Sequence, residues 1–310
     1  MWSIRCALLS YGHDITRVRH PVGARSAHVI APPTTRLGRA GRRHGSIDTV
    51  TDDFPALHVH RYGPVQATQL LLVHGLTGHG RRWETLATRH LSEYATAAPD
   101  LLGHGRSPWV APWTIDANVD ALAALLDGPA LVVGHSFGGA IALKLAAVRP
   151  DLVSGLVLLD PATGLDGGWM RDVADQTLAS PDYTDRDEAR SEKATGSWAD
   201  VAPDELEREL DEHLVELPGG RYGWRISVPA VLSYFSELAR PISLPPKGIP
   251  TVLVRATRTR PPYVHDGLVS ALTTRLGADF TLVDWDCDHM VALAKPEETA
   301  ALIRARLTQG

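Results

Sequence analysis

The stretch ALVVGHSFGGA, residues 130–140, decides the fold of this chain. It begins with an apolar run, Leu131–Val133, of the kind that forms a buried strand, and it leads into the helix-forming run AIALKLAAV, residues 140–148. Ser136 stands between the two, in the pattern G-x-S-x-G. A strand, a sharp turn and a helix in this order are typical of a nucleophile elbow, so Ser136 is the candidate nucleophile.

The two glycines of this pattern have a physical reason. A serine on a tight, strained turn has crowded neighbours two residues before and two residues after it, and Gly134 and Gly138 remove the Cβ atoms that would clash there. The hydroxyl of Ser136 then stands clear of the sheet, at the positive end of the following helix. The pentapeptide also occurs by chance in loops, and its place between a strand and an alanine-rich helix is what makes it informative.

Composition bounds the class of protein. The 310 residues suffice for one large domain or two small ones, and 44% hydrophobic with 22% charged residues is ordinary for a globular chain. The net charge of −5 argues against a nucleic-acid partner, and no apolar run is long enough to predict a membrane-spanning helix. Cys6 and Cys287 lie far apart, so we expect neither a disulfide framework nor a zinc site, and we predict a cytoplasmic location.

The N-terminal segment differs from the rest of the chain. Residues 1–47 hold eight arginines and one acid, Asp14, with little periodicity. An arginine-rich composition with few acids also suits an organelle transit peptide. We expect a disordered basic extension and leave it out of the prediction of the fold.

Strands and helices alternate through the remainder. The alternation predicts an α/β fold with a mostly parallel central sheet flanked by helices. Apolar runs predict strands over residues 56–62, 69–73, a short stretch ending near Ala98, 130–134, 155–160, 250–255 and 280–285. Helical patterns fall at about 81–92, 115–127, 137–148, 264–276 and 296–307.

Residues 162–245 break this rhythm. From about Gly168 to Leu217 the pattern is helical and amphipathic, and the many acids are typical of a solvated face. The run DELERELDEHLVEL places four leucines on one face: Leu206, Leu210, Leu214 and Leu217. The aromatic run RYGWRISVPAVLSYF is a candidate pocket lining, although ordinary packing accounts for it equally well.

Four stretches of the chain resemble the α/β-hydrolase superfamily over about residues 56–308. They are LLLVHG, PDLLGHGRS, VVGHSFGG and DCDHM, in the order and spacing of that family. The resemblance implies a serine hydrolase with a helical cap or lid. The α/β-hydrolase core would comprise residues 48–161 and 246–310, with residues 162–245 as a cap inserted after the strand that ends at Asp160.

The resemblance also implies roles for three further residues. Serine is a weak nucleophile and needs a base, and His289, between the last strand and the last helix, lies where the family places its catalytic histidine. The oxyanion of the substrate needs preorganised donors, and the family supplies two backbone N–H groups. Here these belong to Leu76, which follows the His-Gly at the end of the family's third strand in LLLVHG, and to Phe137, which follows the nucleophile.

The acid of the catalytic triad departs from the family pattern. The loop that usually carries it reads ATRTRPPYVHD here, with Arg258 and Arg260 at the expected place. Asp160, after the strand GLVLLD, is the first candidate because some members place their acid there, and Asp266 is the alternative acid. A site with a weak or absent acid is the third possibility. Asp286 and Asp288 are too close in sequence to His289 to orient its ring well.

The implied reaction is hydrolysis of an ester, or a related acyl or C–C bond, in a small to medium apolar substrate through an acyl-enzyme. The aromatic and aliphatic residues of the insertion suggest an apolar pocket: Trp198, Tyr222, Trp224, Val228 and Leu232. C–C hydrolysis of a ring-fission product, peptide or lactone cleavage and cofactor-free peroxidation remain alternatives, as does a non-catalytic ligand-binding protein. The sequence holds no metal-ligand cluster and no phosphate-binding loop, so we expect a small-molecule substrate with neither metal nor cofactor.

Overall fold

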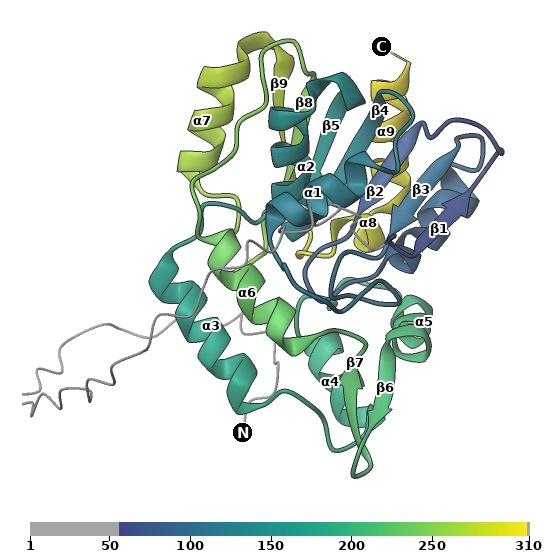
Figure 1. Ribbon diagram of the computed structural model, residues 1–310, viewed down its shortest axis with the longest axis vertical. Helices are drawn as coiled ribbons and strands as arrows, with labels where there is room; N and C mark the ends of the chain where they lie inside the picture. The colour runs from purple at the N-terminus through teal and green to yellow at the C-terminus, as the bar shows by residue number, and fades with distance from the viewer. Residues whose placement is uncertain (1–55, 309–310) are drawn as a thin grey trace, which may run out of the picture. The chain divides into compact units, whose positions relative to one another are not determined.

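A seven-stranded sheet forms the centre of the computed structural model, which describes residues 56–308 (Figure 1). The predicted basic extension, residues 1–47, lies outside the described residues. The strand order is β1-β3-β2-β4-β5-β8-β9, and β1 alone among these seven runs antiparallel to its neighbour. The strands are β1 Val59–Tyr62, β2 Leu70–Val73, β3 Thr96–Pro99, β4 Ala130–His135, β5 Val153–Leu159, β8 Thr251–Ala256 and β9 Phe280–Trp285.

Both faces of the sheet are covered, and this is why its strands are almost entirely apolar. Alternate residues of β2 face opposite sides: Leu71 and Val73 join one core cluster, and Leu70 and Leu72 join the other. The first cluster includes α1 Ile115–Ala123, α2 Phe137–Val148 and α7 Asp266–Leu276. The second includes α8 Val291–Ala294 and α9 Pro296–Leu307. The predicted α/β fold is confirmed.

The segment predicted as one helix over residues 81–92 instead forms two short turns. They are a 3₁₀ turn, η1 Gly80–Trp83, and a π turn, η2 Leu86–His90. Trp83, Leu86 and Leu91 all pack in the second core cluster. Their steps of three and five residues do not fit one stripe of an α-helix, so the backbone tightens and then widens to bury them. Two further 3₁₀ turns follow in the chain, η3 Pro150–Leu152 and η4 Gly277–Asp279.

The insertion, residues 162–245, lies between β5 and β8 and packs at the carboxyl ends of the parallel strands (Figure 1). It contains α3 Gly167–Ala179, α4 Arg186–Thr195, α5 Pro203–His213, β6 Leu214–Leu217, β7 Arg221–Trp224 and α6 Val228–Leu238. The prediction of a helical pattern up to Leu217 is therefore wrong beyond His213.

A hairpin replaces the end of that predicted helix. Gly219 and Gly220, with φ of 88° and 74°, make the reversal that joins β6 to β7, and the two strands pair antiparallel. Glycines between the runs LVEL and RYGW are the usual hairpin signal, which the leucine spacing of the preceding helix obscured.

The elbow glycines are required by the close approach of backbones. A Cβ on Gly134 would lie 2.5 Å from the carbonyl oxygen of Gly138, and a Cβ on Gly138 would lie 2.3 Å from that of Val73. Ser136 between them has φ 53°. The reason that the sequence suggests for these glycines is confirmed.

Replacing Gly138 with alanine is expected to lower the free energy of unfolding by about 1–3 kcal/mol or more, because the atom it would meet is backbone of the central strand β2 and has no room to yield. Gly128→Ala is the matched control, since its added Cβ meets nothing within 4 Å. Chemical denaturation of both variants measures the difference. Equal stability of the two would contradict the packing described here.

Candidate active site

Ser136 occupies a turn that its surroundings hold in place. It lies between β4 and α2, with φ 53° and ψ −118°, and is 6% exposed. Its N–H donates to the carbonyl oxygen of Leu159 at 3.1 Å, and its own carbonyl accepts from the N–H groups of Gly139 at 2.9 Å and Ala162 at 3.0 Å. Neighbouring backbone on β5, α2 and the start of the insertion therefore maintains this unfavourable conformation.

Asp160 follows β5 directly and faces His289. Its Oδ2 lies 2.7 Å from the Nδ1 of His289, and Asp160 is 1% exposed. The Oδ1 accepts from the N–H of Ala256 at 3.2 Å, and the Oδ2 also accepts from the hydroxyl of Thr259 at 3.1 Å. A carboxylate at Nδ1 places the proton of a neutral imidazole there and leaves Nε2 free to accept one.

His289 lies between β9 and α8, two residues before α8 begins, and packs against the elbow. Its ring is 4.5 Å from that of Tyr263 and 4.6 Å from that of His135, measured between centroids. The Nε2–H of His135 donates to the carbonyl oxygen of His289 at 2.8 Å. Since His135 directly precedes Ser136, this bond ties the backbone of His289 to the turn that carries Ser136.

The other candidate acids lie elsewhere. Asp266 begins α7 and is exposed. Arg258, at the place of the usual acid, pairs with Asp200 of the insertion and lies 3.4 Å from Asp286. Thr259 between the two arginines is fully buried and is the residue of this loop that reaches Asp160. Sequence reasoning missed it, and nothing in the local pattern singles it out.

The turn proposed to hold the first oxyanion donor lies against the elbow. A Cβ on Gly75 would lie 3.0 Å from the Cβ of Ser136, so the backbone here passes directly beside the nucleophile. The N–H of Gly78 donates to the carbonyl of Gly75 at 3.0 Å and closes a turn over residues 75–78, which we call the oxyanion turn. Its third residue, Thr77, has φ 61°. That conformation costs a β-branched residue about 1–3 kcal/mol, so its surroundings must hold it.

Four buried histidines near these loops are neutral and structural. The Nδ1 of His74 lies 2.8 Å from the carbonyl of Gly75, and the Nδ1 of His104 lies 3.0 Å from that of Leu102. Burial is the largest cause that lowers the pKa of His104 to about 4 and holds the pKa values of His74, His135 and His213 well below 6.5.

Three potential metal ligands lie close together, and one of them, Asp100, has a structural role in the surrounding loops. Ligand atoms of His58, His60 and Asp100 lie within 4.8 Å of one another. Each oxygen of Asp100 already accepts a backbone N–H, from Gly80 at 2.7 Å and from Arg106 at 2.8 Å. Asp100 thus braces the loops after β2 and β3 by hydrogen bonds.

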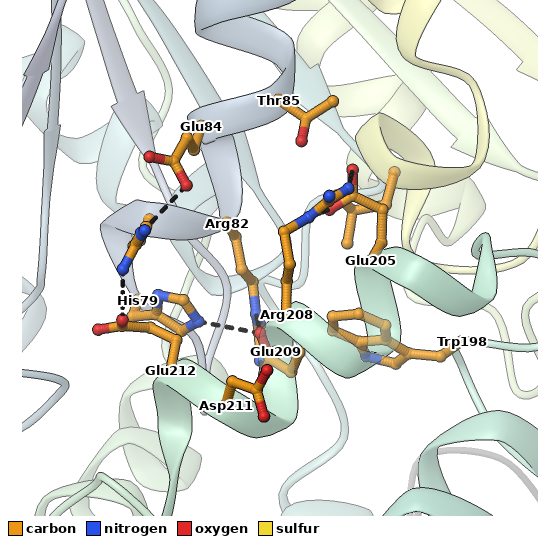
Figure 2. A pocket seen from close by; sticks show the side chains of 12 residues that line it. His79, Arg82, Glu84, Thr85, Trp198, Glu205, Arg208, Glu209, Asp211 and Glu212 are labelled. Atoms are coloured by element: carbon orange, nitrogen blue, oxygen red, sulfur yellow. Dashed lines mark hydrogen bonds and ion pairs between the residues drawn. The ribbon is translucent and has the colours of Figure 1, made fainter.

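Two hollows lie beside the site. The smaller adjoins the elbow and is lined by His74, Gly75, Arg82, Trp83, His135, Met290, Ala292 and Leu293. The larger, of about 280 Å³, lies between η1 and α5 and is lined mostly by charged side chains, including Arg81, Glu84, Arg208 and Glu212 (Figure 2). Trp198 lines it, and the charge of Lys193 lies 4.6 Å from the Trp198 ring and 4.1 Å from that of Trp224. These two tryptophans therefore contact a cation, and an apolar pocket lined by residues of the insertion stays a prediction.

Stability is predicted to fall as the pH drops from 6.5 towards 5. His74, His104, His135 and His213 bind protons at about pH 6.5 in the unfolded chain but only at lower pH when folded, so the unfolded state then holds more protons. Each contributes at most about 1.4 kcal/mol per pH unit between its two pKa values. Urea denaturation at pH 8 to 5 measures the slope, and His135→Gln should make it shallower. A flat profile, or one that rises on acidification, would contradict the neutral state of these rings.

Comparison with known proteins agrees with the fold. The alpha/beta hydrolase family model matches residues 70–302. Lipase LipV of Mycobacterium tuberculosis is 66% identical over 255 residues, which cover 81% of this chain and 97% of that protein. A pimeloyl-[acyl-carrier protein] methyl ester esterase of Methylococcus capsulatus is 28% identical over 240 residues, covering 76% of this chain and 92% of that protein.

Solved structures share the architecture. E-2-(acetamidomethylene)succinate hydrolase superimposes with a TM-score of 0.68 at 22% identity, over 81% of this chain and 95% of that one. An esterase of Mycobacterium tuberculosis gives a TM-score of 0.61 at 22% identity, over 83% and 93%. Among residues 56–308, no helix combines the length and apolar character needed to cross a bilayer. With the sheet order, the elbow and the matched family model together, the chain belongs to the alpha/beta hydrolase family.

Proposed function

We propose that this chain is an ester hydrolase in which Ser136 is the nucleophile, His289 the base and Asp160 the acid. The observation that carries the proposal is the contact of 2.7 Å between Asp160 Oδ2 and His289 Nδ1, beside the turn that presents Ser136. Two relatives in the same family are named lipase and methyl ester esterase, which supports an ester as the substrate.

In the proposed reaction, Nε2 of His289 takes the proton from the hydroxyl of Ser136 as Oγ attacks the carbonyl carbon of the ester. The N–H groups of Leu76 and Phe137 donate to the oxyanion of the tetrahedral intermediate. When the intermediate collapses, the C–O bond to the alcohol breaks and His289 returns the proton to that alcohol. His289 then takes a proton from water, which attacks the acyl carbon. The bond to Ser136 Oγ breaks, His289 returns the proton to Oγ, and the carboxylic acid product leaves.

The buried acid has a defined part in this scheme. Asp160 keeps the proton of the imidazole on Nδ1 and stabilises the imidazolium that forms during each half-reaction. Ala256 and Thr259 occupy the other positions around its carboxylate, so the carboxylate has one orientation towards His289.

We further propose that the insertion, residues 162–245, is a cap that covers the site and governs the choice of substrate, with residues 48–161 and 246–310 as the core. Its packing at the carboxyl ends of the strands supports this role. A small to medium apolar acyl group and a cytoplasmic location remain predictions.

A fluorophosphonate probe tests the nucleophile. We expect covalent labelling of the wild-type protein at Ser136 and loss of labelling in Ser136→Ala and His289→Ala, because the first lacks the hydroxyl and the second lacks the base. Peptide mass spectrometry locates the label. An unlabelled wild-type protein would favour the non-catalytic alternative.

The identity of the acid is tested separately. Asp160→Asn should lower kcat for a p-nitrophenyl ester by about 10⁴-fold, since the amide cannot stabilise the imidazolium and favours the wrong tautomer. Asp266→Asn, at an exposed position, is the matched control and should keep normal turnover. The assignment is wrong if the first variant retains its activity and the second loses it.

A further inference from the structure

Glu209 is a buried acid in a helix whose other acids are mostly solvated. It lies on α5 of the insertion, on the same face as Leu206, Leu210 and His213, and its side chain is 1% exposed. It carries three charged or polar partners. The Nε and Nη2 of Arg82 donate to its two oxygens at 3.0 and 2.5 Å, the Nε2–H of His79 donates at 2.9 Å, and Lys193 Nζ donates at 3.1 Å.

These partners join two parts of the molecule. His79 and Arg82 belong to the core, in and before η1, whereas Lys193 and Glu209 belong to α4 and α5 of the insertion. Figure 2 shows His79 and Arg82 both directed at Glu209. Burial by itself raises the pKa of the Glu209 carboxyl, but the charges of Arg82 and Lys193 outweigh it and hold that pKa well below its usual range. Glu209 is therefore an ionised acid that fastens the insertion to the core.

The same arginine reaches the oxyanion turn. Its Nη2 has two N–H groups, of which one donates to Glu209 and the other to the carbonyl of Thr77 at 3.0 Å. The guanidinium is planar, so its bidentate contact with Glu209 fixes the direction in which the remaining N–H points. Glu209 thereby sets the position from which Arg82 holds Thr77.

A second side chain of the insertion holds the same carbonyl. The Nε2–H of His213 donates to the carbonyl oxygen of Thr77 at 3.0 Å. The centroid of the His213 ring lies 4.6 Å from that of His79, which donates to Glu209. On the other side of the residue, the N–H of Thr77 donates to the Nε2 of His104 at 3.3 Å. Thr77 is thus held from the core and from the insertion in the left-handed conformation that it must keep.

We propose that Glu209 is a positioning residue for the oxyanion turn: through Arg82, His79 and His213 it makes the direction of the Leu76 N–H depend on the docked insertion. The carbonyl of Thr77 shares its peptide group with the N–H of Gly78, which donates to the carbonyl of Gly75 at 3.0 Å. The Gly75 carbonyl in turn shares its peptide group with the Leu76 N–H, so a rotation of the Thr77 carbonyl is passed to that N–H. The inference rests on the proposed role of Leu76 as an oxyanion donor. It means that the donor is in place only when the insertion is closed on the core.

Glu209→Gln tests the inference, because the amide has the same shape as the carboxylate but removes the negative charge that Arg82 and Lys193 contact. We expect kcat for a p-nitrophenyl ester to fall about 10- to 100-fold, with KM changed less than about twofold, since the oxyanion forms only after binding. A trifluoromethyl ketone, whose adduct with serine carries the oxyanion, should lose affinity by the same factor as kcat/KM.

Glu212→Gln is the matched control. Glu212 lies on the same helix and also joins the insertion to the core, through Arg81 at 2.8 Å and Arg106. Within residues 56–308, it makes no hydrogen bond to the oxyanion turn. It should leave kcat and ketone affinity unchanged. Arg82→Lys is the second variant, and it keeps the test decisive if Glu209→Gln does not fold. A single ammonium group cannot replace the guanidinium that donates to both Glu209 and Thr77. This variant should therefore reproduce the loss of kcat.

Rates are expressed per active site by titration with the fluorophosphonate. Parallel losses of kcat and ketone affinity in Glu209→Gln and Arg82→Lys, absent from Glu212→Gln, support the proposal. An unchanged kcat per titrated site, a rise in KM alone, or equal losses in all three variants overturns it. Failure of the wild-type protein to react at Ser136 is a different result, because it overturns the proposed function as well.

Discussion

The close approach of three backbones at Ser136 is the constraint on which the rest of the site depends. Gly138 lies so near the carbonyls of Val73 and His74 that a methyl group has no space, and a Cβ on Gly75 would lie 3.0 Å from the Cβ of Ser136. The carbonyl of Ser136 accepts a hydrogen bond from the N–H of Ala162, two residues after Asp160. The proposed nucleophile, the oxyanion turn and the proposed acid therefore share one closely packed centre, and displacement of any one of them would disturb the others.

Much of this centre could be predicted from sequence because its determinants are local. Apolar runs identified the strands, the glycine spacing identified the elbow, and the position after the last strand selected His289. The acid could only be narrowed to candidates, because the usual loop carries arginines. Asp160 lies beside His289 because β5 pairs parallel with β8 and β8 pairs parallel with β9, which brings together residues 129 positions apart.

The parts that sequence missed depend on long-range contacts. Thr259 gives no local signal because its partner is Asp160, 99 residues away. Glu209 was interpreted with the other acids as part of a solvated face, yet it follows Leu206 by three residues and precedes His213 by four, which places it on the buried side of α5. An acid on the apolar face of a helix was the available clue. Its meaning required knowledge of Arg82, 127 residues earlier.

The central claim is that an ester is cleaved through an acyl group carried by Ser136. Rapid-quench mass spectrometry of the wild-type protein during turnover of a p-nitrophenyl ester tests it most directly. The account predicts a transient mass increase equal to the acyl group, located on the peptide that contains Ser136, which disappears as the ester is exhausted. Two results would contradict the account. One is turnover with the acyl group on a residue other than Ser136. The other is an initial burst of p-nitrophenol release during which no acyl group is found on the protein.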